Sequence, residues 1–155
     1  MAGDANRSGN QEFERRKMRM IRRILFWVLS CTWGIVMTLV GAFVTLALLI
    51  TGHKPHKFGC TIYFEVKKAS GAFSCGPFTV TPPYQSRGLL SHEAGHAIQN
   101  IMYGPLMPFI VSLPSVIRFY HRARIQKKNP QAQLSDYDSI WFEAQATKLG
   151  IRHFM

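Results

Sequence analysis

The stretch LSHEAGHAIQN, residues 90–100, carries the most informative pattern in the chain. It contains the spacing His-Glu-x-x-His, formed by His92, Glu93 and His96. Residues four apart on a helix share one face, so the two imidazoles can reach a single ion. Glu93 follows directly, where a carboxylate can take a proton from a metal-bound water. The stretch therefore predicts a zinc site with two histidine ligands and Glu93 as general base.

The residues around this motif favour a helix over about 86–103. Apolar side chains recur at helical spacing, and Gly104-Pro105 is a strong stop signal. Gly95 lowers helix propensity by about 1 kcal/mol relative to Ala. That cost is easier to understand if another backbone must approach this helix closely.

A third zinc ligand must come from a small number of acids. After residue 23 only five remain, namely Glu65, Glu93, Asp136, Asp138 and Glu143. Glu143 falls in an otherwise apolar segment that predicts a helix from about residue 135 to Gly150. A carboxylate there is costly unless it is paired or metal-bound, which favours Glu143 as a ligand. The alternative is a solvent-facing Glu143 beside Gln145 or Lys148.

The N-terminal part of the chain predicts a membrane anchor. Residues 24–52 contain no charged side chain and exceed the ~20 residues that cross a bilayer core. We expect one transmembrane helix there; a buried core helix and a signal peptide are the alternatives. The basic run RRKMRMIRR at residues 15–23 predicts a cytoplasmic N-terminus, with the C-terminal domain on the non-cytoplasmic side.

The net charge of +11 indicates lipid rather than nucleic acid as the acidic partner. The basic residues cluster beside apolar segments, before residue 24 and again in RFYHRARIQKK at 118–128. This placement is typical of contact with anionic headgroups. No nucleic-acid-binding motif accompanies the charge, so no nucleic-acid partner is expected.

Two further segments complete the predicted fold. CTIYFEV and AFSCGPFTV, separated by KKASG, predict a β-hairpin at the edge of a small sheet. Cys60 and Cys75 flank it and either form a disulfide or remain free thiols. Residues 106–117 (LMPFIVSLPSVI) are apolar but short and carry two prolines, which favours a re-entrant, interface-embedded or protein-packed segment. If this segment crossed the bilayer completely, the basic clusters at residues 15–23 and 118–128 would both lie on the cytoplasmic side, as the positive-inside rule prefers. A second transmembrane span is therefore the alternative.

Taken together, these motifs resemble a known arrangement. HEAGH followed by a helix bearing E-x-x-x-x-x-L-G resembles the gluzincins, in which HExxH and a downstream Glu hold zinc. The runs GHAIQN, GPLMPFIVSLPSVIR and YDSIWFEAQATKLG, within residues 53–150, resemble small bacterial membrane proteins with an HExxH core. The resemblance implies His92, His96 and Glu143 as zinc ligands and Glu93 as base.

One position departs from the gluzincin pattern. Gluzincin helices often carry an Asp four residues after the ligand Glu, where it orients a histidine; this chain has Thr147 there. Thr is a weaker partner for an imidazole, and Asp136, about two turns earlier on the predicted helix, is an alternative. A catalytic site also needs a group that stabilises the oxyanion. The candidates are Tyr84, Tyr103, His121 and Tyr137.

We therefore expect an α+β chain: a polar, basic tail (1–23), a transmembrane helix (24–52) and a zincin-like domain (53–155) that contains the hairpin, a helical core and the proline-containing membrane-associated segment. The favoured function is a membrane-anchored, Zn²⁺-dependent metallohydrolase, most simply a peptidase acting on a peptide or protein. One alternative is a non-enzymatic interaction or assembly subunit with a structural or degenerate zinc site. Another is a structural protein without metal.

Overall fold

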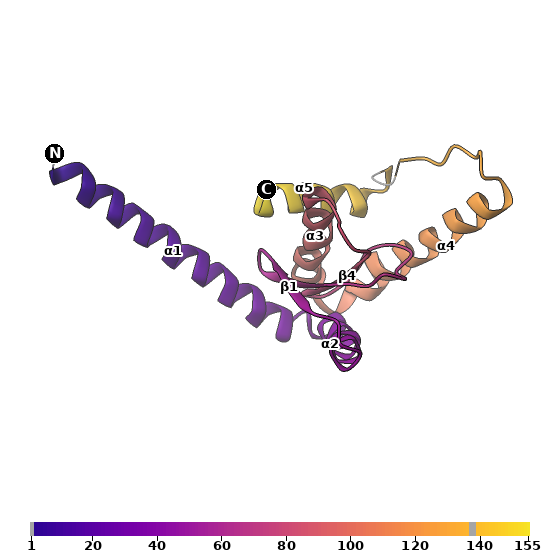
Figure 1. Ribbon diagram of the computed structural model, residues 1–155, viewed down its shortest axis with the longest axis horizontal. Coiled ribbons are helices and arrows are strands. Elements are labelled where there is room, and N and C mark those ends of the chain that lie inside the picture. Colours follow the sequence, from indigo (N-terminus) through magenta and orange to yellow (C-terminus); the bar gives the residue numbers. More distant parts are fainter. Residues whose placement is uncertain (1, 137–138) are drawn as a thin grey trace.

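The computed structural model describes residues 2–136 and 139–155, with side chains from residue 10 onward (Figure 1). It confirms an α+β fold, in which helices surround one four-stranded sheet. The α-helices are α1 (Ala2–Cys31), α2 (Ile35–Ile50), α3 (Arg87–Tyr103), α4 (Leu113–Lys128) and α5 (Trp141–Phe154). A 3₁₀ turn (Gly104–Leu106) and a π-helical turn (Pro108–Ser112) connect α3 to α4.

The prediction of one helix over residues 24–52 is wrong. The uncharged run forms the end of α1 and all of α2, which meet at a break over residues 32–34 and are bent by 95°. The buried Thr38 hydroxyl donates to the Ser30 carbonyl at 2.7 Å, and the Asn100 amide donates to the Gly34 carbonyl at 3.2 Å. The first bond satisfies a carbonyl group that a continuous helix would bond internally. The second adds a donor to the Gly34 carbonyl, which also accepts from the Thr38 amide at 3.2 Å.

Neither α1 nor α2, nor any other described helix, combines the length and the apolar composition needed to cross a bilayer alone. Two pairs of consecutive helical segments, each pair bent at a short break, have the required length and apolar composition when the two segments are taken together. These are Asn10–Cys31 with Ile35–Ile50, and Arg87–Leu106 with Pro108–Lys128, the second pair bent by 116°.

The sheet differs from the predicted hairpin. Its strands are β1 (Pro55–Phe58), β2 (Thr61–Glu65), β3 (Phe73–Cys75) and β4 (Phe78–Thr81), in the order β1-β2-β4-β3. The second predicted strand is split by Gly76-Pro77 into the antiparallel pair β3–β4, with Gly76 at φ +59°. As a result β4, rather than β3, lies beside β2, and the two run parallel with Phe64 opposite Val80. β3 is left at the edge of the sheet.

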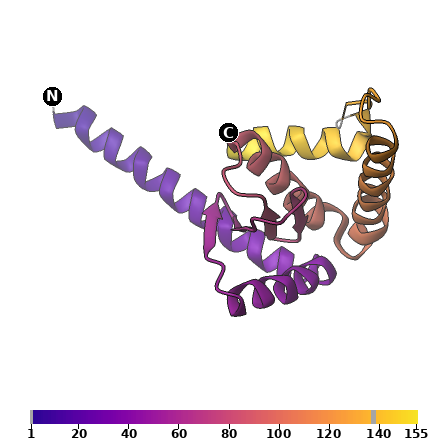
Figure 2. The same cartoon turned by 45° about the vertical axis from the view of Figure 1, so that its right-hand side comes forward.

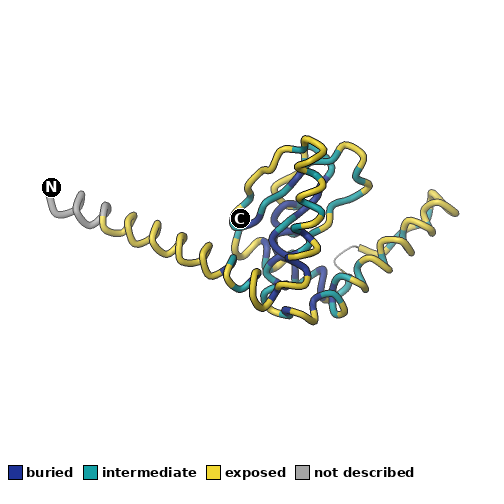
Figure 3. The backbone as a smooth tube through the Cα atoms, turned by 90° about the horizontal axis from the view of Figure 1, so that it is seen from below, coloured by how far each residue is buried: buried dark blue, intermediate teal, exposed yellow. Residues whose placement is uncertain are grey.

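The helix predicted around the HExxH motif is confirmed as α3. It begins after Ser86, whose hydroxyl accepts a hydrogen bond from the Leu89 amide at 3.2 Å. Figures 1 and 2 show α5 lying across α3. The central turns of α3 are buried, as the dark segment in Figure 3 shows, so the motif lies in the core.

Two glycines allow the backbones of α3 and α5 to touch. A Cβ on Gly95 would overlap the Ala146 carbonyl, and a Cβ on Gly150 would overlap the Ser91 carbonyl. The close approach predicted at Gly95 is therefore confirmed. The prediction that Gly150 ends the last helix is wrong, because α5 runs from Trp141 to Phe154 and Gly150 lies inside it.

The proline-containing segment after α3 turns sharply, as its two prolines predicted. Gly104 adopts φ +53° against the Trp33 ring, and the π-helical turn then leads into α4. None of the residues of α4, all of which are described, is fully buried. The helix extends away from the core in Figure 3. Its apolar side chains are largely exposed, including Leu113, Val116 and Ile117.

Candidate metal centre

The side chains predicted as zinc ligands meet at one point between α3 and α5. The Nε2 atoms of His92 and His96 are 3.2 Å apart, and they lie 3.2 and 3.1 Å from one carboxylate oxygen of Glu143. Ligands bound at about 2.0–2.2 Å to a tetrahedral zinc lie roughly 3.3–3.6 Å from one another. Among the described residues, this is the one group of three or more His, Cys, Asp or Glu side chains gathered closely enough to hold an ion. The three residues fit a zinc site.

The tautomer of His96 is set by Gln99. The Gln99 amide nitrogen donates to the Phe142 carbonyl at 2.7 Å and to the Gln145 side-chain oxygen at 2.9 Å. A backbone carbonyl can only accept, so the Gln99 oxygen must face His96 Nδ1, which lies 2.8 Å away. Neutral His96 then carries its proton on Nδ1 and presents a lone pair at Nε2. Tyr103 extends this network through a 2.8 Å bond to Gln145.

Thr147 is in contact with the other ligand. Its hydroxyl lies 2.7 Å from His92 Nδ1. In the tautomer that directs the His92 Nε2 lone pair to the shared point, the Nδ1 proton is donated to this hydroxyl. Both imidazoles are thus oriented through Nδ1, as metal-binding histidines commonly are. Three acceptor atoms then converge at the centre, an arrangement that requires a shared proton or a cation between them.

Glu143 is completely buried and is held at both oxygens. The Ser115 hydroxyl of α4 donates to Oε1 at 2.7 Å, while Oε2 faces the imidazoles. Burial alone would raise the pKa of Glu143, but the bonds from His92, His96 and Ser115 outweigh burial and hold it far below its ordinary value. Glu143 is therefore an anion at neutral pH, as a metal ligand must be.

The same contact shifts the pKa of His96 in the opposite direction. Burial alone would lower the pKa of His96, but the hydrogen bond with Glu143 and the nearby charge of Glu93 outweigh burial and raise it. In the metal-free protein, a proton on His96 then occupies the position where a cation would neutralise the same carboxylate.

Glu93 lies beside the three ligands, and its carboxylate is hydrogen-bonded to the sheet. It is 5% exposed, and its Oε2 accepts a 2.7 Å hydrogen bond from the Ser74 hydroxyl of β3. Ser74 in turn lies 2.9 Å from the Thr79 hydroxyl of β4. The sheet therefore orients the predicted general base.

A mainly apolar cavity of about 180 Å³ adjoins the centre. Its polar lining comes from Glu93, His96 and three serines, Ser74, Ser112 and Ser115. Its apolar lining comes from α2, β3, the π-helical turn and α4, with Met37, Phe73, Met107, Val111 and Val116. Two hollows of about 430 and 350 Å³ lie between the segment around Gly71 and Phe119 of α4, and the larger one reaches His92 and Glu93. We name these three adjoining spaces the site groove.

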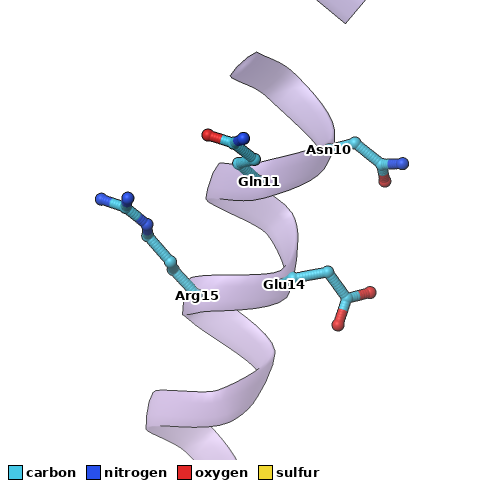
Figure 4. A pocket seen from close by; sticks show the side chains of 4 residues that line it. All are labelled: Asn10, Gln11, Glu14 and Arg15. Carbon is cyan, nitrogen blue, oxygen red and sulfur yellow. The ribbon is translucent and has the colours of Figure 1, made fainter. Parts of the chain in front are cut away.

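A further hollow is unrelated to this centre. It measures about 500 Å³ and lies against one exposed face of α1, where Asn10, Gln11, Glu14 and Arg15 line it (Figure 4). A single solvated helix borders it, so it forms no enclosed site.

Other predicted site residues lie elsewhere. Asp136 is exposed and precedes α5, so the prediction that it shares a helix face with Glu143 is wrong. Cys60 and Cys75 are free thiols rather than a disulfide. Cys75 lines the cavity near Glu93, where burial and the Glu93 charge raise its pKa to about 11. Cys60 lines a separate cavity.

The oxyanion candidates are not brought together at the centre. Tyr103 donates its hydroxyl to Gln145, Tyr84 is 95% exposed, and His121 is exposed on α4. Tyr137 lies outside the described residues.

Sequence reasoning missed four polar residues of this site. They are Ser74, Gln99, Ser115 and Gln145. Gln99 had a readable signal, because it is a polar side chain one helical turn after His96 on a buried face. Ser74 and Ser115 had none, because their contacts depend on how β3 and α4 fold back onto α3.

Comparisons with protein-family models, with curated proteins and with solved structures gave no significant match.

Proposed function

We propose that the protein is a membrane-attached, zinc-dependent hydrolase that cleaves peptide bonds. The observation that supports this most is the convergence of His92, His96 and Glu143 beside a separately held Glu93. Three protein ligands leave a fourth position of a tetrahedral ion for water or substrate, which is typical of catalytic rather than structural zinc. Glu93 and His96 line the same cavity, so substrate in the cavity contacts the centre.

In the proposed reaction, Glu93 transfers the proton and Ser74 orients Glu93. When bound, zinc polarises a carbonyl and lowers the pKa of its water. The Glu93 carboxylate accepts the proton of the attacking water and then donates it to the leaving amine nitrogen. The Ser74 hydroxyl holds Glu93 Oε2 at 2.7 Å, which fixes the direction in which the carboxylate takes up that proton.

The shape of the site groove favours a peptide as substrate. β3 is the edge strand of the sheet, and its residues line the groove opposite α4. An extended peptide can pair with a free strand edge through its backbone, which gives affinity for any sequence. The apolar cavity then accepts one large apolar side chain of that peptide, and this selects where it is cut.

Exposed apolar side chains support attachment to a bilayer. On α2 they include Val40, Phe43 and Ile50, and on the turn between α3 and α4 they include Leu106 and Phe109, each at least 45% exposed. The 3₁₀ turn lies against α2, so the two surfaces are neighbours. Apolar surface this extensive is typical of contact with a membrane. The side of the membrane on which each terminus lies stays a prediction.

A structural zinc site in a non-enzymatic assembly subunit is the second candidate. It is favoured by the deep burial of Glu143, at 0% exposure, and by the neutral Thr147 beside His92. The two candidates differ in what Glu93 does, because a structural site has no use for a general base.

Replacing the base separates these functions. We expect full-length Glu93→Gln, purified in neutral detergent, to retain zinc and to lose cleavage of a peptide library read by mass spectrometry. Loss of one catalytic acid–base group lowers the rate by about 10²–10⁴-fold. The matched control is Glu65→Gln on β2, which changes the same charge and should cleave normally. Equal cleavage by wild-type protein and Glu93→Gln would contradict the proposed mechanism.

A further inference from the structure

A second cavity, remote from the metal centre, gathers positive charge. It measures about 370 Å³ and lies between α1 and the first two strands. Arg23 and Trp27 of α1 line one wall, Lys57 of β1 lines another, and residues 59–62 supply the remainder. None of these lining residues is acidic, and all belong to the described part of the chain. We name this space the Arg23–Lys57 cavity.

The walls of the Arg23–Lys57 cavity are fixed by packing. The Trp27 ring makes edge contacts with Phe26 and with Phe78 of β4. The turn that joins β1 to β2 has Gly59 at φ +58°, with the Phe154 ring of α5 against it. The cavity is thus bounded by several elements, unlike the hollow along α1.

The basic residues here have a specific position along the chain. Arg23 is the last charged residue before the uncharged run that begins at Ile24. It precedes the end of α1 at Cys31 by eight residues, which is roughly 12 Å of helix. An interfacial helix buries its apolar face about 5–10 Å below the headgroup boundary. If α2 contacts acyl chains as proposed above, Arg23 lies near the depth of the lipid phosphates.

The lining residues match the chemistry of such a phosphate. A guanidinium binds phosphate oxygens through two parallel N–H bonds, and a lysine ammonium adds a mobile point charge. Tryptophan is enriched at the headgroup level, where its ring contacts acyl chains and its N–H meets polar atoms. Lys54, exposed on the chain just before β1, adds to the positive potential.

We propose that the Arg23–Lys57 cavity binds the phosphate of an anionic phospholipid headgroup. A bound headgroup there would hold α1 and β1 at a defined depth, and with them the site groove. This inference rests on the membrane attachment proposed above but not on the metal centre, because the Arg23–Lys57 cavity is lined by none of the three proposed ligands.

The test uses full-length protein in neutral detergent and counts bound lipid by native mass spectrometry. The probes are phosphatidylglycerol, phosphatidylcholine and inorganic phosphate. We expect one phosphatidylglycerol to be retained about tenfold more strongly than phosphatidylcholine, since each tenfold step needs only about 1.4 kcal/mol. The double variant Arg23→Gln/Lys57→Gln should lose this preference. The control Arg15→Gln/Lys68→Gln removes the same charge outside the cavity and should keep it.

Three results would overturn the inference. Equal retention of the two lipids would remove the anionic headgroup as ligand, and equal loss in both double variants would show diffuse charge attraction instead of a site. Inorganic phosphate that displaces the lipid completely at millimolar concentration would show a site for free phosphate. Zinc content is measured in every sample, so that a misfolded variant or a failed metal centre is recognised separately.

Discussion

The Nε2 atom of His96 lies 3.1 Å from a carboxylate oxygen of Glu143, although 47 positions separate the two residues in sequence. This contact exists because α3 and α5 cross with their backbones touching at Gly95 and Ala146. The metal centre is therefore a property of one helix crossing.

Gly95→Ala should destroy the centre without removing any ligand. The added methyl group would overlap the Ala146 carbonyl, and backbone atoms cannot move aside without separating the helices. We expect a loss of about 1–3 kcal/mol in the free energy of unfolding and a large loss of zinc affinity. The control is Gly88→Ala in the first turn of the same helix, where the nearest atom is 3.7 Å away. That variant should be neutral or more stable, and similar zinc affinity in both variants would contradict the proposed role of the crossing.

Gln99 should control the affinity of the centre through the tautomer of His96. In Gln99→Leu the Nδ1 proton loses its acceptor, so we expect zinc to bind about 10–100-fold more weakly in a chelator competition assay. Gln145→Leu removes one acceptor of the Gln99 amide nitrogen but leaves the Gln99 oxygen beside His96 Nδ1, so it should bind zinc more tightly than Gln99→Leu. Equal loss of zinc affinity in the two variants would show that Gln99 does not act through His96 Nδ1.

Ser115 should couple α4 to the centre. Its hydroxyl donates to Glu143 Oε1 at 2.7 Å, so Ser115→Ala frees one oxygen of the buried carboxylate. We expect zinc affinity to fall by about tenfold while the fold is retained, as monitored by circular dichroism. Ser112→Ala is the matched control, because the Ser112 hydroxyl contacts only the weak acceptor Met37 Sδ, at 3.7 Å. Equal losses in the two variants would point to general loosening of the segment.

Zinc affinity should fall as the pH is lowered. Zinc and a proton compete for His96 Nε2, and contact with Glu143 raises the pKa of His96 above its ordinary 6.5. A raised pKa means that the proton competes at a higher pH than it would for an exposed histidine. Between about pH 7.5 and about pH 5.5 the affinity should drop by more than tenfold, after correction for protonation of the chelator. A constant affinity over this range would contradict histidine ligation.

The sequence predicted the parts of this site that depend on local spacing. His92 and His96 share a face on any helix, and a small residue at Gly95 indicated a close neighbour. Gly150 was misread, because a glycine inside a helix and one at its end look alike until the partner backbone is known. The break in the uncharged run was also hidden, because residues distant in sequence contact it, such as the Asn100 side chain, 66 positions away from Gly34.

The strand order of the sheet also could not be predicted from neighbouring residues. Two adjacent strand signals predicted a hairpin, since neighbouring strands usually pair. The turn at Gly76 instead reverses the chain early, so that Val80 rather than a β3 residue lies opposite Phe64. Pairing between separated strands depends on tertiary packing, about which the local sequence pattern carries little information.

The zinc content of purified full-length protein shows directly whether His92, His96 and Glu143 bind a metal ion. After mild chelation and reconstitution with zinc, we expect about one zinc per chain by inductively coupled plasma mass spectrometry. Glu143→Ala should lose that zinc, while Glu65→Ala, which removes a carboxylate from β2, should keep it. Well-folded wild-type protein that binds no zinc, or Glu143→Ala that binds as much zinc as wild type, would exclude a zinc site at His92, His96 and Glu143.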